Sequence, residues 1–263
     1  MAQTLVSAAS RLASPHFFRS HLPHTPLCTV VWLYGKSRAV IGNSDGIGLA
    51  LTRRLLAQGY QVTGLSKSAA LVDHPSYQHF VRDVTDPEYR VLLQTILAER
   101  PELHLCIYCA GIGGPLDFAN LAFETRVFEV NLMAAVVTTE LVLDYMIKKG
   151  SGHFIGLSSI ADSLTSAEAP SYSASKAGIS RYWEGLALAL SGKTVKLTNV
   201  RFGFVDTKMA KAKHKPLMLT AENAAGFIVA QVNRPRIRAT KPYAMAVLVW
   251  LLERYMRLSL LIR

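Results

Sequence analysis

The chain has 263 residues, half of them apolar, so it can bury one large core and a single domain is expected. Its net charge of +11 is uneven, because residues 45–200 hold thirteen Lys/Arg against fifteen Asp/Glu, whereas residues 201–263 hold twelve against three. The nearly neutral central part argues against a nucleic-acid-binding fold. The basic C-terminal segment favours contact with anions or with an anionic membrane.

Residues 1–35 show no sustained periodicity and include Pro15, Pro23 and Pro26. We interpret them as a disordered extension, and their lack of acidic residues leaves a transit peptide as the alternative. Residues 36–240 form the predicted dinucleotide-binding catalytic domain, and residues 241–263 a C-terminal apolar and basic helix. A cytoplasmic location is expected, with a mitochondrial or peripheral membrane location as the alternative.

From residue 38 onward, predicted strands alternate with predicted helices. The strands are expected at 38–41, 60–65, 79–81, 103–109, 153–157 and 195–201, and the helices at 46–58, 87–99, 118–147 and 171–190. Strands separated by helices require a parallel sheet that is covered on both faces. The predicted fold class is therefore α/β, a single doubly wound Rossmann-type domain with a central parallel sheet flanked by helices.

The three cysteines, Cys28, Cys106 and Cys109, are too few for a disulfide framework and indicate a reducing compartment. Cys106 and Cys109 lie in an apolar strand, where residues three apart face opposite ways. Since no second cysteine pair completes a zinc site, we interpret them as small core residues and predict no metal site. His104 and His153, at strand starts, are expected to be structural.

A glycine turn, Gly42-Asn43-Ser44-Asp45-Gly46-Ile47-Gly48, follows the first predicted strand. Glycines at this point let the backbone approach a pyrophosphate, while the helix that starts near Gly46 directs free N–H groups at the anion. The spacing differs from G-x-G-x-x-G, so taken alone the turn could also be an ordinary tight connection.

Tyr172 and Lys176 are four residues apart, so on a helix they share one face. An ammonium about 4 Å from a phenol, at an effective dielectric of about 20, supplies about 4 kcal/mol toward a phenolate. We therefore expect Lys176 to lower the pKa of Tyr172 toward neutrality, so that the tyrosine can exchange a proton with a substrate oxygen. Ser159 lies thirteen residues before the tyrosine.

Together these motifs resemble those of the classical short-chain dehydrogenase/reductase family over residues 38 to about 240. The resemblance implies catalytic roles for Ser159, Tyr172 and Lys176, and a role for Asn131 in a relay of water and lysine. It also implies cofactor contacts, through Gly42, Ser44, Gly46, Ile47, Gly48, Ser66, Lys67, Asp83, Val84, Ala110, Gly111, Tyr172, Lys176, Val205 and Thr207.

The chain departs from the family pattern at three places. The usual Thr before the first glycine is Ile41, the Asn-Asn-Ala-Gly string begins with Tyr108-Cys109, and the Pro-Gly after the sixth strand is Phe202-Gly203. None of these changes removes a proton-transfer group, and we expect packing to compensate for the lost polar contacts.

The end of the second predicted strand bears on the choice of cofactor. An acidic residue there would bind the ribose hydroxyls and repel a 2′-phosphate, whereas Ser66 followed by Lys67 suits the phosphate. NADP(H) is therefore favoured over NAD(H). Asp45 is a contrary sign, because related NADP-dependent proteins often carry a basic residue at that position.

The segment after the sixth strand, residues 207–218, occupies the place of the family's mobile lid and carries Lys208, Lys211, Lys213 and Lys215. These lysines indicate either an anionic substrate or a solvated basic loop. The apolar stretch at 243–252 is too short to span a hydrocarbon layer of about 30 Å. Its helix is expected to pack on the domain or on a second subunit, or to lie at a membrane interface.

The family resemblance implies an NAD(P)H-dependent oxidoreductase that interconverts a carbonyl and an alcohol by hydride transfer, with Tyr172 as proton donor or acceptor. The partners expected are a small-molecule carbonyl or alcohol, a homodimer or homotetramer, and peripheral membrane contact through the C-terminal helix, with no nucleic acid. The alternative is a non-catalytic dinucleotide-binding regulator or scaffold, although such a protein has no need of Ser159, Tyr172 and Lys176 together.

Overall fold

The structure is a computed structural model that describes residues 37–209 and 216–262. The chain divides into two units, Met1–Trp32 and Leu33–Arg263. The predictions for residues 1–35, for Cys28 and for Lys211, Lys213 and Lys215 therefore lie outside the described residues. The description below concerns the second unit.

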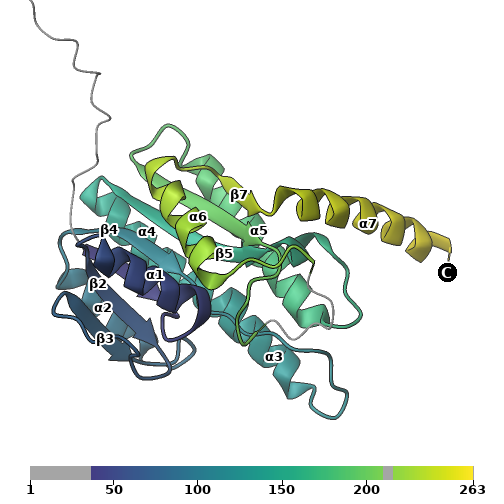
Figure 1. The fold of residues 1–263 in the computed structure, drawn as a ribbon, viewed down its shortest axis with the longest axis horizontal. Helices are drawn as coiled ribbons and strands as arrows, with labels where there is room; N and C mark the ends of the chain where they lie inside the picture. The colour runs from purple at the N-terminus through teal and green to yellow at the C-terminus, as the bar shows by residue number, and fades with distance from the viewer. Residues whose placement is uncertain (1–36, 210–215, 263) are drawn as a thin grey trace, which may run out of the picture. The chain divides into compact units, whose positions relative to one another are not determined.

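The centre of this unit is a seven-stranded sheet in which every neighbouring pair of strands is parallel (Figure 1). The strand order is β3-β2-β1-β4-β5-β6-β7. The strands are β1 (Ser37–Ile41), β2 (Gln61–Ser66), β3 (Tyr77–Val81), β4 (Leu103–Tyr108), β5 (Gly152–Ser159), β6 (Val195–Phe202) and β7 (Arg238–Lys241). The predicted fold class is confirmed.

The helices that connect these strands match most of the predicted ranges. They are α1 (Gly46–Ala57), α2 (Tyr89–Ala98), α3 (Ala122–Phe128), the π turn η1 (Glu129–Met133), α4 (Ala134–Lys149), the 3₁₀ turn η2 (Ile160–Ser163), α5 (Pro170–Ala189), α6 (Ala221–Asn233) and α7 (Tyr243–Ile262). The single helix predicted at 118–147 is wrong in detail, because it begins at Ala122 and is interrupted by η1. The prediction also missed α6 and β7.

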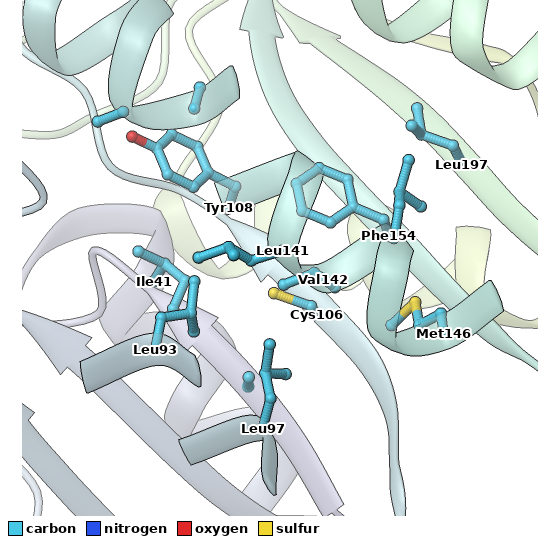
Figure 2. Packing of buried hydrophobic residues seen from close by; sticks show 14 of the residues in the cluster. Ile41, Leu93, Leu97, Cys106, Tyr108, Leu141, Val142, Met146, Phe154 and Leu197 are labelled. Atoms are coloured by element: carbon cyan, nitrogen blue, oxygen red, sulfur yellow. The ribbon is translucent and has the colours of Figure 1, made fainter. Parts of the chain in front are cut away.

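Two layers of helices cover the sheet. Helices α2, α4 and α5 pack on one face, and α1 and α6 on the other. Figure 2 shows the first layer, where Leu93 of α2 and Val142 of α4 surround Cys106 of β4. Among the described residues, the stretch Ala122–Lys149 is long and apolar enough to cross a membrane, but half of it is buried within the fold, as in a core helix.

Packing compensates for the three departures from the family pattern. Ile41 lies fully in the core beneath α2 and α4, and Phe202 packs edge-on against Phe227 of α6 with ring centroids 5.8 Å apart. The hydroxyl of buried Tyr108 donates to the backbone oxygen of Val130 at 3.0 Å. These bulkier side chains therefore fill space and, for Tyr108, still satisfy a buried polar group.

Cys106 and Cys109 contact the cores on opposite faces of the sheet, as the strand period predicted. Burial raises the pKa of Cys106 to about 12, and it raises that of Cys109 as well. Both thiols therefore stay protonated at neutral pH, which disfavours a redox role. His153 is buried, lies 2.9 Å from the Thr198 hydroxyl and has its pKa lowered by burial to about 4, as suits a neutral structural histidine.

A buried ion pair near the carboxyl end of β6 connects three elements of the fold. Arg201 of β6 donates through Nε to Oδ2 of Asp162 in η2 at 2.6 Å, and its side chain is only 8% exposed. Ser180 of α5 donates to the same oxygen at 2.7 Å, and Arg201 also donates to the Ser163 hydroxyl at 2.8 Å. The carboxylate thus ties η2, β6 and α5 together.

Replacing Arg201 with Met should lower the free energy of unfolding by about 3–5 kcal/mol, because the buried carboxylate of Asp162 then loses its cation. The double variant that adds Asp162→Leu should recover part of the loss. Lys148 pairs with Asp144 on the surface at 2.7 Å, so Lys148→Met is the matched control, with an expected loss of no more than about 1 kcal/mol. Urea unfolding measures all three, and equal losses for the two single variants would contradict the assignment.

Candidate active site

The site begins where the strand order reverses. Neighbouring strands β1 and β4 continue into connections that run in opposite directions along the sheet, which opens a crevice at their carboxyl ends. Gly42 follows β1 with a φ of 81°, and a Cβ at this position would lie 2.5 Å from the backbone nitrogen of Ala110, just after β4. Only glycine permits this contact between the two loops.

The N-terminus of α1 lies at the same crevice. Asp45 caps the helix, since its Oδ1 accepts a hydrogen bond from the Gly46 nitrogen at 2.7 Å, and its Oδ2 lies 2.9 Å from the ammonium of Lys208. The hydrogen bond from Lys208 is the main cause of the lowered pKa of Asp45. The basic segment after β6 and the glycine turn are therefore joined by an ion pair that the sequence alone did not indicate.

The glycine turn fits a dinucleotide. A Cβ at Gly46, which has a φ of 49°, would lie 2.8 Å from Cγ2 of Thr207, and one at Gly48 would lie 2.1 Å from the backbone oxygen of Gly42. The buried Oδ1 of Asn43 accepts no hydrogen bond from any described residue. A tight glycine turn at a helix N-terminus suits a bound diphosphate, because the free backbone N–H groups of the first helical turn can donate to it. The Asn43 oxygen is itself an acceptor and would need a donor other than the phosphates.

Side chains from β2 and β3 form the far end of the crevice. Ser66 ends β2 and is buried, its hydroxyl donates to the backbone oxygen of Ser68 at 3.0 Å, and the next residue, Lys67, is exposed. Nε2 of His79 on β3 lies 2.9 Å from the same oxygen, and Nδ1 of this residue lies 2.8 Å from the Tyr77 hydroxyl. Sequence analysis missed this Tyr77–His79 pair, because the pairing of β3 with β2 brings it there.

Asp83, predicted to contact adenine, follows β3. Its Oδ1 accepts from the backbone nitrogen of Thr85 at 3.0 Å and from the Thr85 hydroxyl, and its Oδ2 pairs with Arg126 of α3 at 2.8 Å. These bonds and the nearby guanidinium lower the pKa of Asp83, although burial opposes the shift. The carboxylate is held rigidly beside the buried side chain of Val84.

The three predicted catalytic side chains converge from β5 and α5. Ser159 is the last residue of β5; its hydroxyl accepts from the Ala161 nitrogen at 3.1 Å and donates to the Phe202 oxygen at 3.4 Å. It also lies near enough to the Tyr172 hydroxyl to affect the pKa of the tyrosine. Lys176, one turn after Tyr172, donates from Nζ to the Leu157 oxygen at 3.0 Å. The serine, the tyrosine and the lysine that sequence analysis grouped therefore lie near one another at the carboxyl end of β5.

The expected electrostatics of this pair are wrong in direction. Burial raises the pKa of Tyr172, while the nearby Ser159 hydroxyl opposes the shift and the negative charge of Asp162 adds to it. The ammonium of Lys176 lies 5.9 Å from the centre of the tyrosine ring, and burial lowers the pKa of this lysine to about 8. Loss of hydration is the main cause of both shifts, and Lys176 is not among the groups that lower the pKa of Tyr172.

Asn131 lies in η1, where the π turn brings it against the loop after β4. Its Oδ1 accepts from the Ile112 nitrogen at 2.8 Å, and its Nδ2 donates to the Ile112 oxygen at 2.9 Å and to the Ser175 hydroxyl at 3.1 Å. A Cβ at Gly111 would lie 3.4 Å from Oδ1 of Asn131 and 3.6 Å from Nζ of Lys176. The asparagine and the lysine therefore flank the same glycine.

Two further segments complete the site. Gly113 passes over the tyrosine ring, because a Cβ there would lie 2.8 Å from Cδ2 of Tyr172. After β6, Val205 is buried and bridges to Leu219, and the Thr207 hydroxyl donates to the Val205 oxygen at 3.4 Å. The predicted contacts of Val205 and Thr207 with the nicotinamide, and the others assigned by resemblance, stay predictions, including those of Ser44, Ile47 and Ala110.

Comparisons with known proteins agree with this geometry. The family model for short chain dehydrogenases matches residues 36–217. The 3-oxoacyl-[acyl-carrier-protein] reductase of Escherichia coli is 29% identical over 222 residues, with 81% of this chain and 88% of that protein covered. The cis-4-hydroxycyclohexanecarboxylate dehydrogenase of Sinomonas cyclohexanicum is 30% identical over 208 residues, with 74% of this chain and 83% of that protein covered.

Among solved structures, a short chain dehydrogenase from Burkholderia cenocepacia in complex with NADP superposes with a TM-score of 0.73 at 22% identity. The superposition covers 86% of this chain and 96% of that one, which shows the same fold. With the glycine turn, the crevice and the grouping of Ser159, Tyr172 and Lys176 in place, the chain belongs to the short-chain dehydrogenase/reductase family and is an oxidoreductase that works with a nicotinamide dinucleotide.

Proposed function

We propose that this chain reduces the carbonyl group of a small or lipid-like compound with NADPH, and oxidises the matching alcohol in reverse. The observation that carries the proposal is the convergence of Ser159, Tyr172 and Lys176 at the carboxyl end of β5. In this arrangement the Ser159 hydroxyl binds the carbonyl oxygen of the substrate, and the Tyr172 hydroxyl delivers a proton to it. The Lys176 ammonium stabilises the negative charge that then remains on the tyrosine.

When bound, the reduced nicotinamide supplies the hydride, with its two electrons, to the carbonyl carbon and is itself oxidised. The Ser159 hydroxyl donates a hydrogen bond to the carbonyl oxygen. Tyr172 transfers its phenolic proton to that oxygen as the charge develops, which yields the alcohol. A phenol whose pKa is raised by burial is fully protonated at neutral pH, so it is ready to act as the donor.

Lys176 and Asn131 act next to the tyrosine rather than on the substrate. The ammonium stabilises the tyrosine anion after proton transfer, and its lowered pKa eases the return of a proton along the helix face. Asn131 holds the Ile112 backbone through two hydrogen bonds and thereby fixes the loop between β4 and α3 over the ring. A relay of water from Asn131 to Lys176 belongs to the same proposal.

Tyr172→Phe should lower turnover about a hundred- to ten-thousand-fold and leave cofactor binding nearly intact, because only the hydroxyl is lost. The matched control is Tyr182→Phe, which removes a phenol hydroxyl about 15 Å further along the same helix. Turnover is followed by NADPH consumption with a panel of ketones and aldehydes. Near-normal turnover of the Tyr172 variant would exclude this tyrosine as the donor and favour a non-catalytic dinucleotide-binding role.

The raised pKa of Tyr172 also sets the pH dependence. Carbonyl reduction uses the protonated phenol and should stay constant through the neutral range, whereas alcohol oxidation needs the phenolate and should rise with pH. Initial rates in both directions over a pH series give the two profiles. An oxidation rate that falls as the pH rises above neutrality would contradict this assignment.

NADP(H) is proposed over NAD(H) because β2 ends at buried Ser66 and is followed by exposed Lys67, with no acidic residue at this place. The related short chain dehydrogenase from Burkholderia cenocepacia was solved with NADP, which supports the same choice. Asp45 is the opposing feature, but its carboxylate is already engaged by the Gly46 nitrogen and by Lys208. The cytoplasmic location and the homodimer or homotetramer stay predictions.

Lys67→Ala should weaken the binding of NADPH by about 1.5–3 kcal/mol and leave that of NADH nearly unchanged, because one charge-assisted bond to the 2′-phosphate is lost. Lys193→Ala is the control, since this exposed lysine lies just before the amino end of β6, whereas Lys67 follows the carboxyl end of β2. Fluorescence titrations with both cofactors separate the outcomes. Equal losses for NADPH and NADH would identify Lys67 as a simple loop residue.

A further inference from the structure

Helix α7 follows β7 and extends away from the sheet (Figure 1). It contacts the rest of the domain along one side only. Met245 and Val249 are buried and form a small core with Ile160 of η2. Farther along the same face, Glu253 accepts a hydrogen bond from the backbone nitrogen of Thr165 at 3.2 Å. These contacts define the inner side of α7.

The opposite side of α7 is apolar and open. Leu248, Leu251 and Leu258 are 62%, 53% and 62% exposed, and the aromatic side chains of this side are exposed as well. At about 100° per residue, the arc from Trp250 to Leu248 covers about 160° of the helix surface, and we call it the outer arc. It consists of Tyr243, Val247, Leu248, Trp250, Leu251, Tyr255 and Leu258.

The charges on α7 are separated between the two sides. Arg254 lies within the outer arc and is exposed, with its guanidinium carbon 4.4 Å from the centre of the Trp250 ring. The one acidic residue of α7, Glu253, is directed inward to Thr165. The outer arc therefore combines leucines, three exposed aromatic residues and a cation. It belongs to the C-terminal segment 201–263, which holds twelve basic residues against three acidic ones.

This combination favours a lipid surface over a second copy of the chain. Two packed helices cover only a narrow stripe of each other's surface. If α7 packed against the α7 of a second copy, much of the apolar 160° arc would therefore stay exposed to water. A second copy would also bring another Arg254 to the seam and no acidic residue to pair with it. A planar anionic interface can cover the whole arc, accept the tyrosine and tryptophan rings at headgroup depth and pair with the arginine.

We propose that the outer arc of α7 docks the protein on an anionic membrane surface, with the helix lying in the plane of the interface. A spanning orientation does not fit, since Glu253, Arg254 and Arg257 interrupt the apolar run well before the roughly 20 residues that a crossing helix requires. The docking surface is independent of the chemistry at Tyr172.

Sedimentation with vesicles tests the proposal on the full-length chain. The wild type should sediment with phosphatidylcholine vesicles that contain phosphatidylserine, and much less with phosphatidylcholine alone or at high salt. Arg254→Glu should lower the partition coefficient about tenfold or more. Leu251→Glu should lower it similarly, whereas Val91→Glu, which places the same carboxylate on an exposed apolar position of α2, should not.

Tryptophan fluorescence gives a second readout. Trp250 is 51% exposed and Trp183 only 1%, so docking should shift the emission of Trp250 to shorter wavelength and protect it from acrylamide. In Trp250→Phe this change should be lost. A wild type that stays in the supernatant with both kinds of vesicle overturns the proposal. So does a chain that elutes as a dimer, becomes a monomer on Leu251→Glu and shows no vesicle binding, because a second copy then covers the arc.

Discussion

The close approach of the turn after β1 to the end of β4 is the constraint on which the site depends. Gly42 has no side chain, so its backbone can lie against Ala110, and this contact determines where the crevice opens in the sheet. The following helix then starts at Gly46, with its N–H groups at the mouth of the crevice. A Cβ at Gly42 would separate the two loops. It would displace the glycine turn that is suited to the diphosphate, and also the loop that passes over Tyr172.

Burial dominates the chemistry of the catalytic helix. Lys176 is 6% exposed and donates to a backbone oxygen, so its charge lies in a region with few solvent contacts. Charges in such a region are tolerated when polar neighbours balance them. Beneath the pair, Ser158 lies 2.7 Å from the Ser180 hydroxyl, which in turn donates to Asp162. A polar network therefore extends from the Lys176 backbone oxygen, which accepts from the Ser158 hydroxyl at 3.3 Å, to the ion pair between Asp162 and Arg201.

The period of the apolar residues was sufficient to predict the parallel sheet and most helix positions, because buried strands and amphipathic helices leave strong local patterns. The family spacing predicted that Ser159 lies near Tyr172, and in the structure the serine is close enough to affect the pKa of the tyrosine. The pKa of Tyr172 was mispredicted, since burial depends on residues distant in sequence. For the same reason the ion pairs of Arg201 and Lys208 left no local signal: their partners lie 39 residues away in one case and on the turn after β1 in the other.

The π turn η1 places a length constraint on the chain. A π turn holds one residue more than the regular helix on either side, and here it separates α3 from α4. Deleting one residue within 129–133 would merge the two helices and rotate α3 by about 100° relative to α4. Glu124 of α3, which accepts from the Ser171 nitrogen at 3.1 Å, would then leave the first turn of α5. A substitution at another position of η1 should therefore disturb the packing of α3 less than a deletion does. The orientation of the Asn131 side chain depends on the number of residues in the π turn.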